Sequence, residues 1–484
     1  MLTELKILSK ETAVYGLSTV VGRLLNILLL PLYTHCLTPT EYGIVATVFS
    51  YIAFLNVLYG YGMDFAFMRH TETQDSSYFS TAFWSLLISS LGLSGLIHLF
   101  SGAITAVAGI APELSDITRY AAWILALDAM ALLPFAQLRM SHRAGLYAGI
   151  KVVNIVINLA LNYVFLFKLS MGVRGVFLAS LTTSAATFLL LLPIMIPKLK
   201  LIFDLKSYQS LLRSALPLVP AGLASMMVQV IDRPILKFLT NDASVGIYQA
   251  NYRLGIFMMM AVNMFDASWR PFFIEKARQD NAPQILSRVL TYFTLAASCL
   301  FLFITLFVGP VIRLPLIGGK SIIHPAYWGG LSIVPVVTLG YLFNGIYVNM
   351  LAPVTIKKRS EFVAYATGLG ALVNVASNFA LIPRWGMMGA AWATALAYAA
   401  MALALFAMGR KVYPIDYEIR RLSHLALCLM LVLGAAQFLG IGMSSNHLLW
   451  RLGLLAAFPI TLVVSGFFNE EERLALKKRL GKQV

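Results

Sequence analysis

Apolar stretches of about twenty residues, separated by short polar connectors, follow one another along the sequence from Thr12 onward. A helix needs roughly twenty predominantly apolar residues to cross about 30 Å of hydrocarbon. We therefore predict an all-α polytopic membrane protein with about fourteen transmembrane helices. Their expected limits are residues 12–33, 42–62, 78–101, 117–138, 144–167, 173–196, 213–234, 245–268, 287–309, 328–352, 361–382, 387–409, 421–441 and 448–468.

Two distant stretches of the sequence share one plan, which indicates an internal duplication. In residues 151–180 two asparagines four apart precede two glycines three apart, and the stretch from Asn374 onward repeats both spacings. We predict a helix, a tight turn and a second helix in each copy, with small residues that let the second helix pack closely. The residues are Asn154, Asn158, Gly172 and Gly175 in the first copy and Asn374, Asn378, Gly386 and Gly389 in the second.

An earlier pair of segments supports the duplication. Gly43 lies twelve residues after Pro31, and Gly246 lies twelve residues after Pro234. The copies are separated by a little over two hundred residues, so the repeat unit is about half of the chain. Repeats of several helices are a common way to build transporters.

The repeats and the connectors predict a division into five parts. The longest basic amphipathic connector falls between the two repeats, and we expect it to lie along the inner membrane interface. Asn469 stands where a helix N-cap belongs, and the charges that follow it suit a helix dipole. The predicted parts are an N-terminal six-helix bundle (1–196), an interfacial basic linker (197–212), a C-terminal six-helix bundle (213–409), an additional helix pair (410–468) and a short cytoplasmic tail helix (469–484).

Composition supports the membrane assignment and bears on orientation. Hydrophobic residues make up 59% of the chain, charged residues only 12%, and the mean hydropathy is +0.78, which excludes a soluble globular protein. Lys and Arg are roughly three times as numerous in one set of alternating connectors as in the other. We therefore expect a multi-pass protein of the cytoplasmic (inner) membrane with both termini in the cytoplasm. The net charge of +16 then reflects orientation and contact with anionic membrane lipids, and no nucleic-acid partner is expected.

Basic side chains inside the predicted spans are the main candidates for a binding site. Arg23 and Arg253 lie near the middle of the first and eighth spans, and a charge at that depth usually faces a cavity. Lys151 begins a polar stripe that continues through Asn154, Asn158 and Asn162 on one helix face. One hypothesis is that the bases line a water-filled cavity between the halves and bind a diphosphate or another anion, since guanidinium offers forked donors. The alternatives are pairing of the bases with buried acids and interhelical hydrogen bonding by the asparagines.

Other polar and aromatic residues in the spans leave several roles open. Asp128 is the acid nearest the middle of a span, and it is a candidate for a coupling proton or sodium ion or for a salt bridge to a basic neighbour. Tyr252 is a candidate for lining the cavity and stacking on a sugar ring. Arg233 directly follows Asp232, which favours a capping or gating role over ligand binding.

Signatures of an enzyme are missing from the sequence. Gly318–Ser321 spells GGKS, but the earlier glycine that a phosphate-binding loop requires is replaced by Leu314. The three cysteines are scattered without metal-ligand or disulfide spacing. We expect no catalytic residue, no metal site and no cofactor.

The chain resembles a known family along essentially its whole length. The resemblance rests on the order and spacing of TAVYGLSTVVGRLLNILLLPLYTHCLTPTEYG, of ALPLVPAGLASMMVQVIDRPILKFLTNDASVGIYQANYRL, and of the two asparagine and glycine stretches described above. The family is the polysaccharide-exporter branch of the multidrug/oligosaccharidyl-lipid/polysaccharide superfamily, which includes the O-antigen flippases of lipopolysaccharide synthesis.

The resemblance implies a fold and a function. The implied fold is two six-helix bundles around a V-shaped central cavity, here with two further C-terminal helices. The implied task is to move a polyprenyl-diphosphate-linked oligosaccharide, an O-antigen or exopolysaccharide repeat unit, from the inner to the outer leaflet by alternating access. Related lipid II flippases place essential cavity arginines on the first and eighth spans, where Arg23 and Arg253 lie in this sequence. Other polysaccharide-assembly proteins are expected partners.

Two other functions stay open at this point. A cation-coupled multidrug exporter of the same superfamily typically has twelve spans and a carboxylate-centred site, and both features differ from the pattern predicted here. A membrane-embedded polysaccharide polymerase or ligase would need a large outer loop, whereas no connector here exceeds about eighteen residues.

Overall fold

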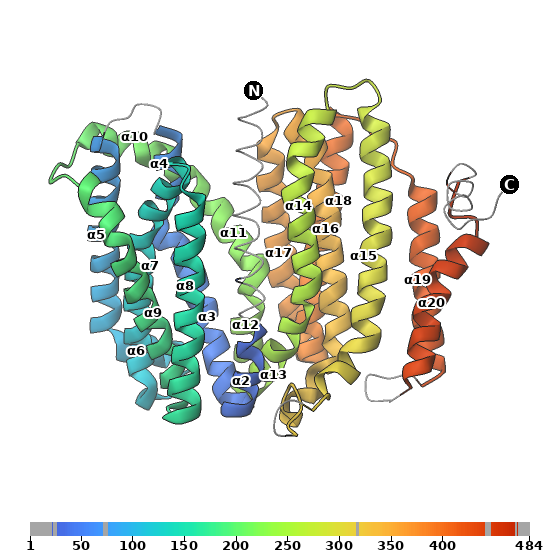
Figure 1. The fold of residues 1–484 in the computed structure, drawn as a ribbon, viewed down its shortest axis with the longest axis horizontal. Coiled ribbons are helices and arrows are strands. Elements are labelled where there is room, and N and C mark those ends of the chain that lie inside the picture. The colour runs from blue at the N-terminus through green and yellow to red at the C-terminus, as the bar shows by residue number, and fades with distance from the viewer. Residues whose placement is uncertain are drawn as a thin grey trace. The chain divides into compact units, whose positions relative to one another are not determined.

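The computed structural model describes residues 22, 27–70, 76–315, 319–440, 447–469 and 472, and this part of the chain is built from helices and their connectors (Figure 1). Eleven helical segments in it are long and apolar enough to cross a membrane, and Leu448–Val464 is a shorter apolar helix. The predicted all-α polytopic class is therefore confirmed. The first predicted span, 12–33, falls mostly outside the described residues, so the total of fourteen stays a prediction.

Each of the other predicted spans overlaps one to three α-helices. The helices of the N-terminal half are α2 (Leu29–Cys36), α3 (Pro39–Gly60), α4 (Met63–His70), α5 (Ser76–Leu99), α6 (Ser101–Val107), α7 (Ser115–Met140), α8 (Ala144–Asn162) with its π-helical continuation η3 (Tyr163–Lys168), and α9 (Gly172–Met195). They are followed by α10 (Leu205–Ala215), α11 (Val219–Val230), α12 (Asp232–Leu239), α13 (Asp242–Tyr252), the 3₁₀ turn η6 (Arg253–Gly255), α14 (Ile256–Lys276) and α15 (Ala282–Ile312). The remaining elements are the 3₁₀ segment η7 (Pro325–Ile333), α16 (Val334–Ile356), α17 (Ser360–Trp385), α18 (Met387–Val412), α19 (Ile419–Phe438) and α20 (Leu448–Val464).

The chain forms two compact units, and α17 and α18 each contribute residues to both. The first comprises Met1–Arg253, Ile323–Gly329 and Gly370–Ala393, and the second comprises Leu254–Ile322, Gly330–Leu369 and Thr394–Val484. The five-part division predicted from the repeats follows different boundaries and stays a prediction.

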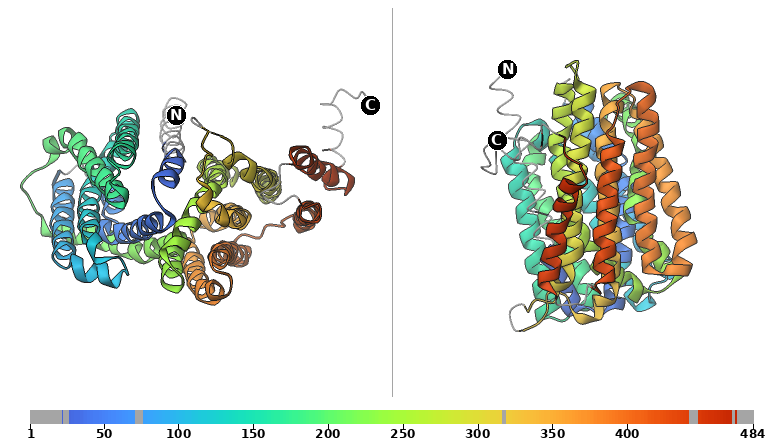
Figure 2. Two further views of the ribbon diagram at one scale, coloured as in Figure 1. Left: turned by 90° about the horizontal axis from the view of Figure 1, so that it is seen from below. Right: turned by 90° about the vertical axis from the view of Figure 1, so that its right-hand side faces the viewer.

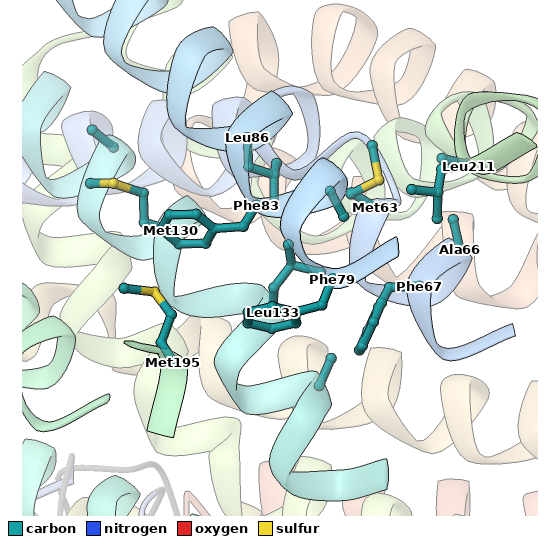
Figure 3. Packing of buried hydrophobic residues seen from close by; sticks show 14 residues of the cluster. Met63, Ala66, Phe67, Phe79, Phe83, Leu86, Met130, Leu133, Met195 and Leu211 are labelled. Carbon is teal, nitrogen blue, oxygen red and sulfur yellow. The ribbon is translucent and has the colours of Figure 1, made fainter. Parts of the chain in front are cut away.

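The core of the first unit joins α4, α5, α7 and α10 (Figure 3). Phe79 and Phe83 of α5 stack on one another and pack against Met63 of α4, Leu133 of α7 and Leu211 of α10. The helix of the predicted basic linker therefore packs one face into this core. The sequence of the helix explains this placement, because Ser207, Leu211 and Ala215 recur every four residues and form one face. These are the residues of the helix that are buried.

Helices α3 and α13 cross at a pair of glycines, one from each copy of the predicted repeat. A Cβ atom on Gly43 would lie 1.8 Å from the carbonyl oxygen of Asp242, and a Cβ on Gly246 would lie 1.9 Å from the carbonyl oxygen of Pro39. Each glycine thus faces the carbonyl four residues before the other, and only glycine permits this approach. The glycines of the two predicted Pro–Gly pairs therefore meet in a reciprocal backbone contact.

The second predicted repeat is confirmed as helix, turn and helix in both copies. Gly172 and Gly386 adopt left-handed backbone conformations, with φ of 57° and 52°, at the turns before α9 and α18. The asparagine pattern differs from the prediction in one respect. The paired hydrogen bonds join Asn162 to Asn158 and Asn378 to Asn374, at 3.1 and 2.8 Å between Nδ2 and Oδ1, so Asn158 and Asn162 are the counterparts of the second pair.

In the second unit, α14, α15 and α16 pack through Val262, Trp269, Leu286 and Val348. Helices α19 and α20 pack on α15, and Figure 2 shows them in red at the edge of this unit. Arg451 of α20 is 1% exposed and donates a hydrogen bond to the carbonyl of Leu306. The predicted tail helix lies almost entirely outside the described residues.

Candidate functional site

A polar cavity of about 570 Å³ lies among α3, α7, α8 and α9 of the first unit. Four residues singled out from the sequence line it together: Asp128 of α7 and Lys151, Asn154 and Asn158 of α8. Periodicity had placed the last three on one face, and the fold brings Asp128 opposite that face. The other polar side chains of the lining are Asn56, Ser180, Thr183, Ser184 and Thr187.

The two charged residues of the cavity, Asp128 and Lys151, each contact an uncharged side chain. Ser184 donates a hydrogen bond of 2.8 Å to Oδ1 of Asp128, and the Lys151 ammonium lies 4.2 Å from the centroid of the Phe135 ring. The described part of the chain contains no direct ion pair between Asp128 and Lys151, one of the alternatives considered from the sequence. Because neither charge is neutralised by contact with the other, both can interact with a molecule or ion in the cavity.

The asparagines of the stripe bind α8 to α9 while lining the cavity. Nδ2 of Asn154 donates to Oγ1 of Thr187 at 2.6 Å, and Nδ2 of Asn158 donates to Oγ1 of Thr183 at 3.4 Å. The interhelical hydrogen bonding considered from the sequence is therefore present. The threonines were missed from the sequence, although hydroxyl residues at positions 183, 184 and 187 follow a helical spacing within an apolar stretch.

The stripe continues beyond the cavity to α2. The buried Asn162 donates to Asn158 and accepts a hydrogen bond of 3.0 Å from the Tyr33 hydroxyl. The π-helical segment η3 begins at the next residue, and such segments are frequent at functional sites. A continuous series of side chains thus joins the cavity to Tyr33.

Arg253 lies beside Tyr33 at the 3₁₀ turn that separates α13 from α14. Its guanidinium carbon is 5.6 Å from the Tyr33 ring centroid and 5.9 Å from that of Tyr42. Its Nη1 atom is buried and has no hydrogen-bond partner among the described residues. The aromatic faces attract the cation, but they leave this donor unused.

Arg233 also lies against tyrosine rings, but unlike Arg253 it is paired with an acid. Its Nη1 binds Asp232 at 2.6 Å, its Nε donates to Gln249 at 3.0 Å, and the Tyr248 hydroxyl donates to the other Asp232 oxygen at 2.5 Å. Its guanidinium carbon lies 4.1 Å from the centroid of Tyr252. Tyr252 is therefore buried under Arg233 and is not part of the lining of the cavity described above.

Arg23, the partner predicted for Arg253, lies outside the described residues. The preceding residue is described, and a Cβ atom on Gly22 would lie 2.9 Å from Cδ1 of Ile155 on α8. The chain at position 22 is thus close to the helix that carries the polar stripe. A role for Arg23 in the same site stays a prediction.

Comparison with known proteins decides the family. A family model described as polysaccharide biosynthesis protein matches residues 8–277, which is more than half of the chain. The chain belongs to this family. The matched residues include the helices of the cavity, the tyrosines of α2 and α3, and Arg253. No curated protein matches the chain.

Solved structures show the fold that this family member shares with transporters. The lipid II flippase MurJ in an inward closed conformation is 16% identical, with a TM-score of 0.75, and the match covers 96% of this chain and 99% of that one. An inward-facing multidrug resistance MATE family transporter of the MOP superfamily is 17% identical, with a TM-score of 0.60 and coverage of 83% and 94%. A MOP superfamily transporter from Pyrococcus furiosus is 14% identical, with a TM-score of 0.59 and coverage of 84% and 95%. At these identities the likeness establishes a common fold.

Proposed function

We propose that this family member is a flippase that moves a polyprenyl-diphosphate-linked oligosaccharide, an O-antigen or exopolysaccharide repeat unit, from the inner to the outer leaflet by alternating access. The observation that carries the proposal is Arg253, a guanidinium held against two tyrosine rings with a buried donor that no described residue binds. An unpaired cation is costly in an apolar surrounding, and a diphosphate would supply the missing acceptors. Membership in a polysaccharide biosynthesis family and the fold shared with a lipid II flippase support this substrate class.

The cavity of the first unit supplies further groups for such a ligand. Lys151 offers a second positive charge, and Asn154 and Asn158 offer amides suited to sugar hydroxyls. We propose that these residues act with Arg253 and Arg23 on the substrate, because the stripe from Asn158 through Asn162 to Tyr33 connects them. The role is one of transport without catalysis. We further propose an inner-membrane location with cytoplasmic termini and a place beside other polysaccharide-assembly proteins.

Transport in vesicles tests this function directly. We expect the purified chain in proteoliposomes to move a fluorescent polyprenyl-diphosphate oligosaccharide between leaflets, so that a membrane-impermeant reductant bleaches more of it than in empty vesicles. A fluorescent phosphatidylcholine should not move, because it lacks the diphosphate and the glycan. Export of cationic drugs without movement of the lipid-linked oligosaccharide would instead establish the multidrug-exporter alternative.

Asp128 favours coupling of this transport to a cation. Its carboxylate faces a cavity that also contains asparagine, serine and threonine oxygens, which suit a proton or a sodium ion. We expect Asp128→Asn to lower gradient-driven transport roughly tenfold, in the range of coupling energies of about 1–3 kcal/mol. The rate should be measured with an imposed proton or sodium gradient and without one. Ser184→Ala, which keeps the charge and removes one hydrogen bond, should have a smaller effect; an unchanged gradient dependence in Asp128→Asn would exclude the coupling role.

A further inference from the structure

The segment that joins α9 to α10 and ends with the first residue of α10, residues 199–205, exposes large apolar side chains at one end of the first unit's helices. Leu201 is 92% exposed and Leu205 60%, and Ile202 and Phe203 are each 47% exposed. Three exposed lysines flank or interrupt this segment, at positions 198, 200 and 206. We call residues 199–205 the apolar loop.

The apolar loop is fixed in place by buried groups of α5. The backbone N–H of Lys200 donates to Oγ of Ser80 at 2.9 Å, and that of Asp204 donates to Oγ1 of Thr81 at 3.1 Å. Both hydroxyl residues are fully buried in α5. The backbone of the loop is therefore held against α5, where Leu199 packs on the core and the other four apolar side chains of the loop stay exposed.

Asp204, the residue that precedes α10, fixes the end of the apolar loop. Asp204 accepts backbone hydrogen bonds from Lys206 and Ser207 at 3.3 and 2.8 Å, which makes it the N-cap of the helix. The hydrogen bonds from Ser207 hold the pKa of the Asp204 carboxyl below its ordinary value, so the cap is charged at neutral pH. Helix α10 then packs on α4 and α5, as Figure 1 shows beside the labels of these helices.

The contact of Trp84 with this loop indicates the depth of the loop in a membrane. The indole N–H donates to the carbonyl of Lys200 at 2.9 Å, so the ring lies near the start of the loop. Tryptophan is enriched where the hydrocarbon region meets the headgroups. Exposed apolar side chains flanked by lysines are typical of a segment that lies in the membrane interface. There the apolar groups enter the hydrocarbon and the ammonium groups reach anionic headgroups.

We propose that the apolar loop is a lipid-binding element that inserts into the adjacent leaflet and binds anionic lipid headgroups. Its occupant is the bilayer surface itself, which the combination of exposed apolar area and positive charge selects over a protein partner. The loop would then hold the α4 and α5 end of the first unit at a set depth in the membrane. The inserting side chains are Leu201, Ile202, Phe203 and Leu205, and the headgroup ligands are Lys198, Lys200 and Lys206.

Fluorescence quenching in the full-length protein tests this inference independently of transport. An environment-sensitive fluorophore is placed at Leu201→Cys, in a background in which Cys36, Cys299 and Cys428 are replaced by serine. The matched control position is Gln209→Cys, an exposed polar site on α10. Vesicles contain either phosphatidylcholine alone or phosphatidylcholine with phosphatidylglycerol, and the quenchers are aqueous iodide and a lipid-attached nitroxide.

Insertion predicts quenching at position 201 by the nitroxide and protection from iodide, with the reverse at position 209. Phosphatidylglycerol should increase the inserted fraction, and each lysine replaced by glutamine should shift the ratio of inserted to exposed loop by roughly fivefold. Equal iodide quenching at both positions in both lipid mixtures would overturn the proposal. If nitroxide quenching changed neither with phosphatidylglycerol nor with the lysine replacements, the proposed binding of anionic headgroups would be wrong.

Discussion

Replacement of Arg253 by lysine will leave the chain folded in the membrane but lower translocation of lipid-linked oligosaccharide by at least about tenfold. A hydrogen bond to a charged group contributes about 1.5–3 kcal/mol, and lysine offers a point charge in place of a planar fork of donors. Little packing is lost, because the guanidinium rests on the faces of Tyr33 and Tyr42 and binds no acid in the described part of the chain. The measurement is bleaching of labelled substrate in proteoliposomes, normalised to the amount of inserted protein.

Arg233→Lys is the matched control, since it also removes a guanidinium packed on tyrosine rings. Arg233 is paired with the buried Asp232 and also donates to Gln249 and to the carbonyl of Gln229. Lysine keeps the charge but cannot make all of these hydrogen bonds, and each buried group left unpaired costs about 1–3 kcal/mol. We therefore expect this variant to reduce the amount of folded protein while the molecules that fold keep their transport rate. If Arg253→Lys instead lost folded protein and kept its rate per molecule, Arg253 would be a structural residue and the anion-binding role would be wrong.

The second large effect is expected where α3 and α13 cross. Gly246→Ala should destabilise the protein by about 3 kcal/mol or more, because the new methyl group would overlap the backbone carbonyl of Pro39, which cannot rotate away like a side chain. Gly43→Ala should have a similar effect through Asp242. Thermal unfolding in detergent, followed by the loss of monodisperse protein, provides the measurement.

Gly149→Ala on α8 is the control for this pair. A Cβ atom at Gly149 would meet nothing within 4 Å, so alanine there should leave stability unchanged or raise it by up to about 1 kcal/mol through its helix propensity. An apparent melting temperature of Gly246→Ala equal to that of Gly149→Ala would show that the two helices separate at little cost.

The positions of the membrane helices could be predicted from hydropathy because burial in lipid demands long apolar stretches whatever the tertiary fold. The prediction succeeds for the segments from residue 42 onward, since each contains a helix. Hydropathy does not predict where the α-helical geometry is interrupted within a span. The π-helical turn after Asn162 and the 3₁₀ turn at Arg253 depend on contacts with other helices, which a local pattern does not contain.

The candidate site was only partly predictable. Spacing identified Lys151, Asn154 and Asn158 as one face of a helix, but it could not show that Asp128 faces them across a cavity. The two arginines illustrate the limit more clearly. Arg233 and Arg253 are the same residue type at nearby positions, and only the fold shows that one is bound to an acid while the other retains an unused donor.

The linker shows a different limit. Its charge and amphipathic pattern predicted a segment along the membrane surface, and the pattern alone could not say which part would face outward. The structure assigns the apolar face of α10 to the protein core, while residues 199–205 carry the exposed apolar side chains. The deciding interactions come from Ser80, Thr81 and Trp84, which lie more than a hundred residues earlier in the chain.

The glycine crossing of α3 and α13 has a consequence for the origin of the chain. Gly43 meets the carbonyl of Asp242, and Gly246 meets that of Pro39, so exchange of the two helices reproduces the same contact. A contact with this property is isologous, the kind that joins identical subunits about a two-fold axis. A half-length ancestor with one such glycine could therefore have formed this crossing with a second copy of itself, before gene fusion placed both copies in one polypeptide.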